Sequence, residues 1–74
     1  MSNTATVLLT INHHQQVEAY AIVEGGVTEL QAFHPSKARL AFNHSMYLCK
    51  KYGADLDTEA SDVRVLGLLE QEDN

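Results

Sequence analysis

The stretch VEAYAIVEGGVTELQAF, residues 17–33, decides the fold, because it predicts two strands joined by a tight turn. Residues 17–24 alternate between small apolar side chains and larger or charged ones, which is the two-residue period of a β-strand. Gly25-Gly26 is typical of a two-residue hairpin turn, in which positive φ angles are needed. Residues 27–33 then return as an antiparallel strand.

A further strand is predicted ahead of this hairpin, at residues 5–11, where ATVLLTI alternates in the same way. We expect it to pair with residues 17–23 across the loop 12–16, which sets Leu8 opposite Tyr20. Both hairpins then direct small apolar residues toward one face. This agreement predicts a three-stranded antiparallel meander.

The expected turn also fixes the register of the second hairpin. It sets Ala21 opposite Leu30 and Ala19 opposite Ala32, so that these four residues face the core. Glu29 then lies on the opposite face of the sheet.

A helix is predicted after the meander, from about residue 36 to Tyr52. Pro35 suits a first helical turn, His34 or Ser36 can cap it, and Gly53 suits the position after the last turn. At about 100° per residue, the side chains expected to pack on the sheet are Ala38, Ala41, Phe42, Ser45, Cys49 and Tyr52.

Residues 63–70, VRVLGLLE, predict a fourth strand that is apolar on both faces. An acidic loop, 54–62, precedes it, and a frayed acidic tail, 71–74, follows it. The predicted fold is therefore α+β with the order β-β-β-α-β. It consists of an antiparallel meander, a fourth strand beside the first, and one helix packed on one sheet face. The chain 1–74 then forms a single small domain.

The net charge of −5 argues against a nucleic-acid ligand, because affinity for nucleic acids comes largely from basic residues that neutralise phosphates. An acidic surface suits basic protein partners, including proteins that themselves bind nucleic acid. A single cysteine excludes a disulfide framework. The first residues do not read as a signal peptide and no apolar run would span a bilayer, so we expect a cytoplasmic protein without membrane contact.

Candidate catalytic and metal-binding residues do not assemble into a motif. His13 and His14 are adjacent and would point to opposite sides of a strand, so we expect a polar turn there. The pattern that begins at Asp55 resembles a calcium loop, but it lacks the glycine and the final glutamate that such loops need. Cys49 falls on the inward helix face, where it acts as a small hydrophobe. We therefore expect no enzyme, no cofactor and no metal.

The face of the sheet without a helix should be polar. Here the register instead gathers Leu8, Tyr20 and Ile22 among carboxylates. Apolar side chains on an exposed face mark an interaction surface, while cross-strand aromatic pairs also stabilise sheets without any partner. The expected binding residues on this face and in the acidic loop are Leu8, Glu18, Tyr20, Ile22, Glu24, Glu29, Asp55, Asp57 and Glu59.

In its size, its acidity and its β-β-β-α-β order, the chain resembles the small phage-encoded anti-CRISPR proteins, some of which have a meander packed on one or two helices. The resemblance spans the whole chain and assigns no residue, because that family shares no signature motif. It implies a DNA-mimicking acidic surface that occupies a DNA-binding groove or covers a subunit, in the host cell cytoplasm. The segment ATVLLTI…VEAYAIVEGG is also similar to the first hairpin of antitoxins with a β-β-β-α module.

We therefore expect a non-enzymatic, acidic protein-binding module that inhibits a host nucleic-acid-binding complex by engaging its basic surface. The alternative is a homodimeric structural, accessory or antitoxin-like protein, in which the same sheet face is buried against its copy. The sequence leaves the partner's identity open.

Overall fold

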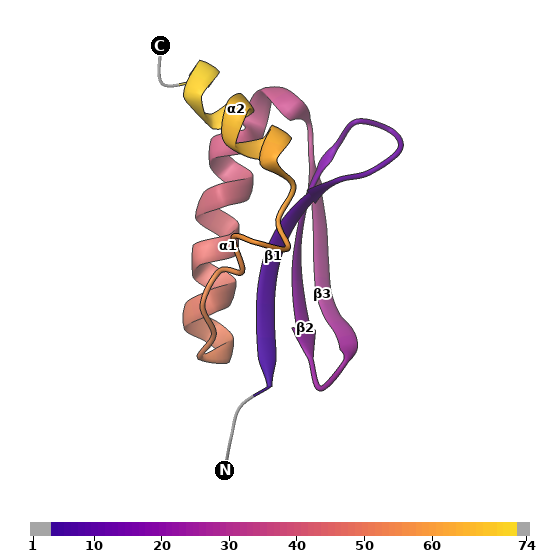
Figure 1. Cartoon of the computed structure of the whole chain (residues 1–74), viewed down its shortest axis with the longest axis vertical. Helices are drawn as coiled ribbons and strands as arrows, with labels where there is room; N and C mark the ends of the chain where they lie inside the picture. Colours follow the sequence, from indigo (N-terminus) through magenta and orange to yellow (C-terminus); the bar gives the residue numbers. More distant parts are fainter. Residues whose placement is uncertain (1–3, 73–74) are drawn as a thin grey trace.

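The computed structural model describes residues 4–72 and shows a three-stranded antiparallel sheet with two helices on one of its faces (Figure 1). The strands are β1 (Ala5–Ile11), β2 (Val17–Val23) and β3 (Gly26–Phe33), paired in the order β1-β2-β3. A 3-10 turn, η1 (Pro35–Lys37), leads into helix α1 (Ala38–Tyr52), and helix α2 (Val63–Glu72) follows. The predicted α+β class and the antiparallel meander are confirmed.

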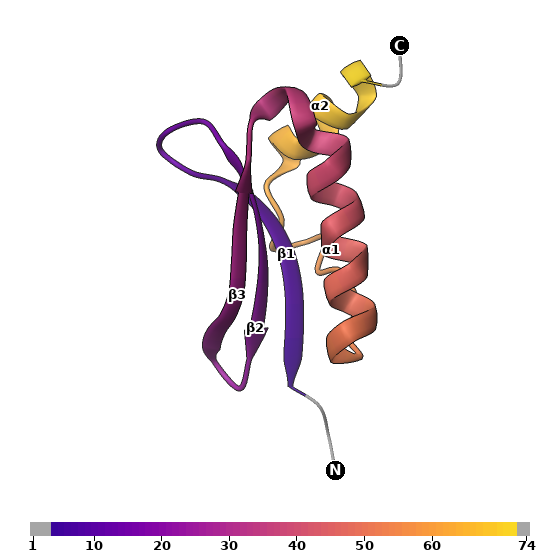
Figure 2. The same cartoon turned by 180° about the vertical axis from the view of Figure 1, so that it is seen from behind.

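The core lies between the sheet and the two helices, as the view from behind also shows (Figure 2). Small side chains on both layers let the helix approach the sheet closely. The buried Ser45 hydroxyl donates to the Phe42 carbonyl at 2.6 Å, so this polar group is satisfied inside the core. The buried apolar residues are Val7, Leu9, Val17, Ala19, Ala21, Ala38, Ala41, Leu48, Cys49, Val65 and Leu69.

The first hairpin has the predicted register. Leu8 lies opposite Tyr20 and Ile11 opposite Val17. The loop between them is closed by Asn12, whose side-chain oxygen accepts the backbone N–H groups of His14 and Gln16 at 2.8 and 3.0 Å. The two histidines are exposed in this loop, which is the polar turn that the sequence predicts.

The second hairpin corrects the prediction. Its turn is formed by Glu24 and Gly25, with φ angles of 53° and 84°, so the turn falls one residue earlier than expected. The strands are also irregular between Ala21 and Ile22, where one extra residue of β3 forms a bulge.

The bulge reverses the side chains of the rest of β3, because one extra residue moves the register by one. Glu29 now pairs with Ala21 and Gln31 with Ala19, so the prediction that Leu30 and Ala32 face the core is wrong. The physical reason is tertiary: the observed register brings Phe33 onto the core and brings Glu29 against α1. Neither gain is visible from strand alternation alone.

Helix α1 begins and ends close to its expected bounds. The Ser36 N–H donates to His34 Nδ1 at 3.1 Å, so His34 provides the cap of the 3-10 turn that precedes the helix. Gly53 ends the helix in a left-handed conformation with φ of 64°. The Ala54 N–H then donates to the Cys49 carbonyl at 2.9 Å.

The predicted fourth strand is wrong, because residues 63–72 form helix α2. Val65 and Leu69 are buried one turn apart, whereas Leu66 is half exposed. Asp62 begins the helix: its Oδ1 accepts the Arg64 N–H at 2.9 Å. The helix includes residues 71–72, which we expected in a frayed tail, and residues 73–74 lie outside the described chain.

The place beside β1 that the fourth strand should fill is taken by the preceding loop. Leu56 forms an isolated parallel bridge with Val7, and the Asp57 N–H donates to the Val7 carbonyl at 2.8 Å. Further along, the Asp62 N–H donates to the Leu9 carbonyl at 2.8 Å. The loop therefore covers the β1 edge with hydrogen bonds, and the following apolar residues are free to form a helix.

The observed turn predicts different effects for alanine at the two neighbouring glycines. Gly25→Ala places a Cβ at a φ of 84° and should lower the free energy of unfolding by about 1–2 kcal/mol. Gly26→Ala should be neutral or slightly stabilising, because its φ is not positive and the new Cβ meets only the Val23 carbonyl, at 3.8 Å. Urea denaturation of both variants measures this. Equal losses would instead indicate the turn at Gly25-Gly26.

Two matched valine substitutions test helix α2. Val65 is 1% exposed and Val63 is 75% exposed, although an alternating strand would place both on one face. Val65→Ala should therefore lower the free energy of unfolding by about 2 kcal/mol, and Val63→Ala should change it by less than about 0.5 kcal/mol. Thermal or urea unfolding measures both. Similar losses at the two positions would contradict the helix.

Candidate functional site

The sheet face turned away from α1 and α2 carries several apolar side chains, and we call it the open face. Both views show the two helices on the other side of the sheet, and no element of residues 4–72 lies over it (Figure 1, Figure 2). By strand pairing and alternation, its side chains are Thr6, Leu8, Thr10, Glu18, Tyr20, Ile22, Val27, Leu30 and Ala32.

The apolar side chains of the open face form two rows across the strands. One row runs from Leu8 through Tyr20 to Leu30, and a shorter row joins Ile22 to Val27. Leu30 is 48% exposed and Val27 is 57% exposed, whereas the other three are half-buried by their neighbours. The expected cluster of Leu8, Tyr20 and Ile22 is thus present, and β3 enlarges it.

Glu18 borders these rows as a fixed anion. The Tyr20 hydroxyl donates to Glu18 Oε1 at 2.8 Å, and Asn12 Nδ2 donates to Glu18 Oε2 at 3.0 Å. The hydrogen bond to Glu18, together with partial burial, raises the pKa of Tyr20. Both ends of the carboxylate are therefore held, and the tyrosine ring is oriented on the open face before any partner arrives.

The other expected binding residues lie elsewhere. Glu24 is in the β2–β3 turn, and Asp55 and Glu59 are exposed in the loop that follows α1. Asp57 has a structural role in that loop, because its Oδ1 accepts the N–H groups of Glu59 and Ala60 at 3.2 and 3.0 Å. The structure therefore does not bring the acidic loop and the open face together as one site.

Glu29 lies on a different face of the sheet from the one that the sequence predicted. We expected it on the open face, but it lies on the helix side, where its Oε2 accepts hydrogen bonds from Lys51 Nζ and the Tyr52 hydroxyl. The hydrogen bond from Lys51, followed by that from Tyr52, lowers the pKa of Glu29. The same carboxylate raises the pKa values of Lys51 and Tyr52. This cluster ties the end of α1 to β3.

The sequence did not identify Leu30 and Ala32 as open-face residues, because the expected turn assigned both to the core. The alternation of Leu30 and Ala32 fits either face, and the bulge before them chooses between the two. In the expected register Phe33 lies on the same face as Glu29, the open face, but it packs instead against the core on the helix side.

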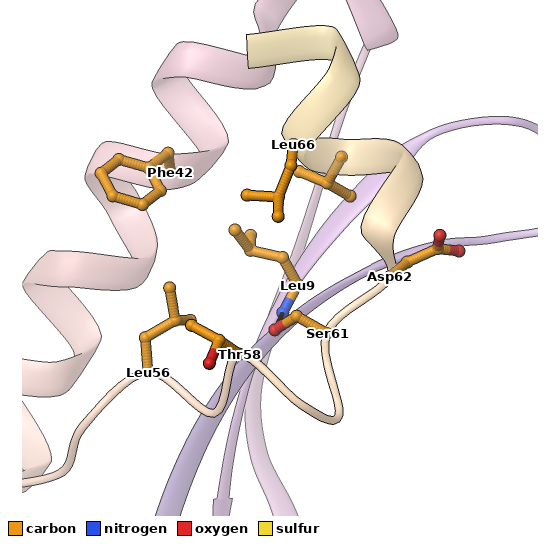
Figure 3. A pocket seen from close by; sticks show the side chains of 8 residues that line it. Leu9, Phe42, Leu56, Thr58, Ser61, Asp62 and Leu66 are labelled. Atoms are coloured by element: carbon orange, nitrogen blue, oxygen red, sulfur yellow. Dashed lines mark hydrogen bonds between the residues drawn. The ribbon is translucent and has the colours of Figure 1, made fainter. Parts of the chain in front are cut away.

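A small cavity lies where the 54–62 loop meets α1, α2 and β1 (Figure 3). Leu9, Leu56 and Leu66 point into it, and the Leu9 N–H donates to Ser61 Oγ at 3.0 Å at its edge. Its volume is about 20 Å³, which is room for roughly one water molecule. The cavity is a packing defect between elements and cannot hold an organic ligand.

The histidines and the cysteine of the described residues lie apart from the open face. No group of three or more His, Cys, Asp or Glu side chains among residues 4–72 is arranged to hold a metal ion. His13 and His14 contact each other in the exposed loop, with ring centroids 4.1 Å apart. Burial raises the pKa of the Cys49 thiol, which disfavours the nucleophilic thiolate.

The chain matches no family model, no curated protein and no solved structure. In the described part of the chain, no helix is both long enough and apolar enough to cross a bilayer.

The cluster around Glu29 predicts a pH dependence of stability with two limbs. Because the native pKa of Glu29 is lowered, its contribution is complete above the ordinary glutamate pKa of about 4.3 and is lost as the pH falls through the lower native value. Because the pKa values of Lys51 and Tyr52 are raised, their contribution is complete below about pH 10 and is lost as the pH rises through the native values.

Glu29→Gln should flatten the acid limb of stability measured by urea denaturation between about pH 2 and 6, since the titrating group is gone. Glu59→Gln is the matched control, because Glu59 is exposed and its side chain makes no ion pair in the described chain. An acid limb that Glu59→Gln reduces as much as Glu29→Gln does would contradict the role of this cluster.

Proposed function

We propose that this protein is a non-enzymatic binding module that captures a protein partner on its open face. The observation that carries the proposal is the apolar surface formed by Leu8, Tyr20, Ile22, Val27 and Leu30, which no described element covers. A sheet face that only meets water normally carries polar side chains at these positions. Contiguous exposed apolar surface is characteristic of an interface.

The arrangement of groups within the open face supports recognition of a protein. Tyr20 lies at the centre of an apolar row, flanked on adjacent strands by Leu8 and Leu30. An aromatic anchor surrounded by aliphatic side chains and bordered by polar groups is the usual composition of an interface hot spot. The hydrogen bond to Glu18 fixes the ring, so little side-chain entropy is lost on binding.

The charge of the chain supports a partner with a basic surface. The chain carries ten carboxylate residues against five lysines and arginines, and Glu18 stands directly beside the apolar rows. We propose that the partner is a nucleic-acid-binding protein or complex and that capture inhibits it, as in the anti-CRISPR proteins that the chain resembles in size and acidity. Long-range attraction would speed such an encounter, and the apolar rows would provide most of the affinity.

The test compares two double variants in a pull-down. Tyr20→Ala/Ile22→Ala removes the centre of both apolar rows and should reduce partner capture by at least about 100-fold, the loss expected for two hot-spot side chains. Val63→Ala/Leu66→Ala is the matched control, because both residues are exposed on α2, far from the open face, and capture should be unchanged. Circular dichroism confirms that both variants fold.

The captured partner then allows a test of inhibition. Adding the wild-type protein to the purified partner should reduce its binding to DNA or RNA in a gel-shift assay, and the Tyr20→Ala/Ile22→Ala variant should not. Equal capture by the two double variants would exclude the open face as the binding surface. Capture without any effect on nucleic-acid binding would support the binding module but contradict its inhibitory role.

A further inference from the structure

The two edges of the sheet differ in whether another segment of the described chain forms hydrogen bonds with them. The β1 edge is covered by the loop that follows α1, through the N–H groups of Asp57 and Asp62. The other edge is β3 (Gly26–Phe33), whose neighbour in the sheet is β2, and no second segment of residues 4–72 pairs with it. The outer side of β3 therefore presents backbone donors and acceptors that can accept another strand.

This edge lacks the features that keep edge strands from pairing. Residues 29–33 contain no lysine and no proline, and the bulge of the hairpin lies before them. Their one charged side chain, Glu29, points to the helix side and is neutralised by Lys51. An edge run without these features is able to pair with another strand.

The helix layer beside β3 is also incomplete. His44 contacts Phe33 of β3 and Tyr47 of its own helix, with ring centroids 5.8 and 5.7 Å apart. Leu40 lies one turn before His44 on the same side of α1, and Leu40 and Tyr47 are both more than half exposed. We call Leu40, His44 and Tyr47 the α1 flank. It places apolar and aromatic surface next to an unpaired strand.

We propose that two copies of the chain form a two-fold dimer in which β3 pairs antiparallel with β3 of the other copy, centred near Gln31. The two sheets become one sheet of six strands, and the two α1 flanks close over the new junction on the helix side. The two open faces become continuous, so dimerisation is independent of the proposed function and leaves that surface free.

A second copy fits this edge better than an isolated peptide strand. A partner at this edge has to extend the sheet with a strand and also extend the helix layer with an exposed apolar surface. A second copy of the chain supplies both. Charge also favours it: the chain carries −5 overall, but at this edge Glu29 is balanced by Lys51. Two copies therefore meet here without burying an uncompensated charge.

The paired segment sets the size of the contact. Pairing centred at Gln31 joins residues 29–33 of each copy, which at about 3.3 Å per residue span about 16 Å. With sheet and helix layers together about 20 Å deep, the footprint is about 330 Å² per copy, or about 660 Å² in total, which is the size of a weak, reversible interface. We therefore expect the dimer to form at high protein concentration.

Sedimentation equilibrium of the full chain tests the dimer. The wild-type protein should sediment at twice its mass of 8.2 kDa. Gln31→Lys sets two lysines against each other across the two-fold axis and should raise the dissociation constant of the dimer by at least about 100-fold. Gln71→Lys is the matched control: it makes the same substitution at an exposed position of α2 and should leave the mass unchanged.

Mixing two variants gives the decisive result. Gln31→Glu should also be monomeric, and an equimolar mixture of Gln31→Lys and Gln31→Glu should restore a dimer that contains one copy of each. Leu40→Ser/Tyr47→Ser attacks the α1 flank without touching β3 and should raise the dissociation constant by about 10-fold.

Three results would overturn the proposal. The first is a wild-type protein that stays at 8.2 kDa at millimolar concentration. The second is a mixture of the two charged variants that stays monomeric. The third is a dimer that survives Gln31→Lys and is lost with Tyr20→Ala/Ile22→Ala, because it would place the contact on the open face. If Tyr20→Ala/Ile22→Ala loses partner capture but still dimerises, the result supports capture on the open face and dimerisation through β3 as two separate properties.

Discussion

The register between β2 and β3 controls which side chains the sheet offers to its helices and which it offers to the surroundings. It is set by one turn, at which Glu24 and Gly25 both adopt positive φ, and by one bulge between Val27 and Glu29. Because side chains alternate along a strand, moving this register by one residue would exchange Glu29 and Leu30 between the two faces. The ion pair with α1 and the apolar row of the open face both depend on it.

The same constraint links the stability of the protein to its surfaces. With Glu29 on the helix side, Lys51 and Tyr52 anchor the end of α1 to β3, and Phe33 contributes to the core at the other end of the strand. The outer side of β3 is left without charge for the same reason. An interaction that holds the fold together thus also leaves an edge on which another strand can pair.

Helix α2 and the loop before it complete the opposite edge. The loop satisfies the backbone of β1 at Val7 and Leu9, and Val65 and Leu69 then fill the space between α1 and the sheet. Residues 54–72 therefore cover one edge and part of one face of the three-stranded sheet. The open face and the β3 edge are what remains, and they are adjacent, so a dimer through β3 would join two open faces into one surface.

Several features of this protein were determined by the sequence alone. Alternation in 5–11 and 17–23 gave the first hairpin and its register, because each strand has one face of small apolar residues and a single short loop between them. The helix, expected from about residue 36 to Tyr52, and its buried side followed from its period, from a cap at His34 or Ser36 and from the glycine at position 53. Leu8, Tyr20 and Ile22 were correctly placed together, because they depend on that first hairpin only.

Tertiary contacts decided the rest. Moving the turn by one residue shifts the register by two and leaves the faces unchanged, so the bulge before Glu29 decides which side chains of β3 reach α1. Strand alternation does not predict this bulge, which brings Phe33 and Glu29 to the helix side. Residues 63–70 are apolar in a pattern that suits both a strand and a short helix, and the hydrogen bonds of Asp57 and Asp62 to β1 exclude the strand because the edge is already occupied. Local periodicity determines what an element can be, and competition for the same backbone groups and core volume determines what it becomes.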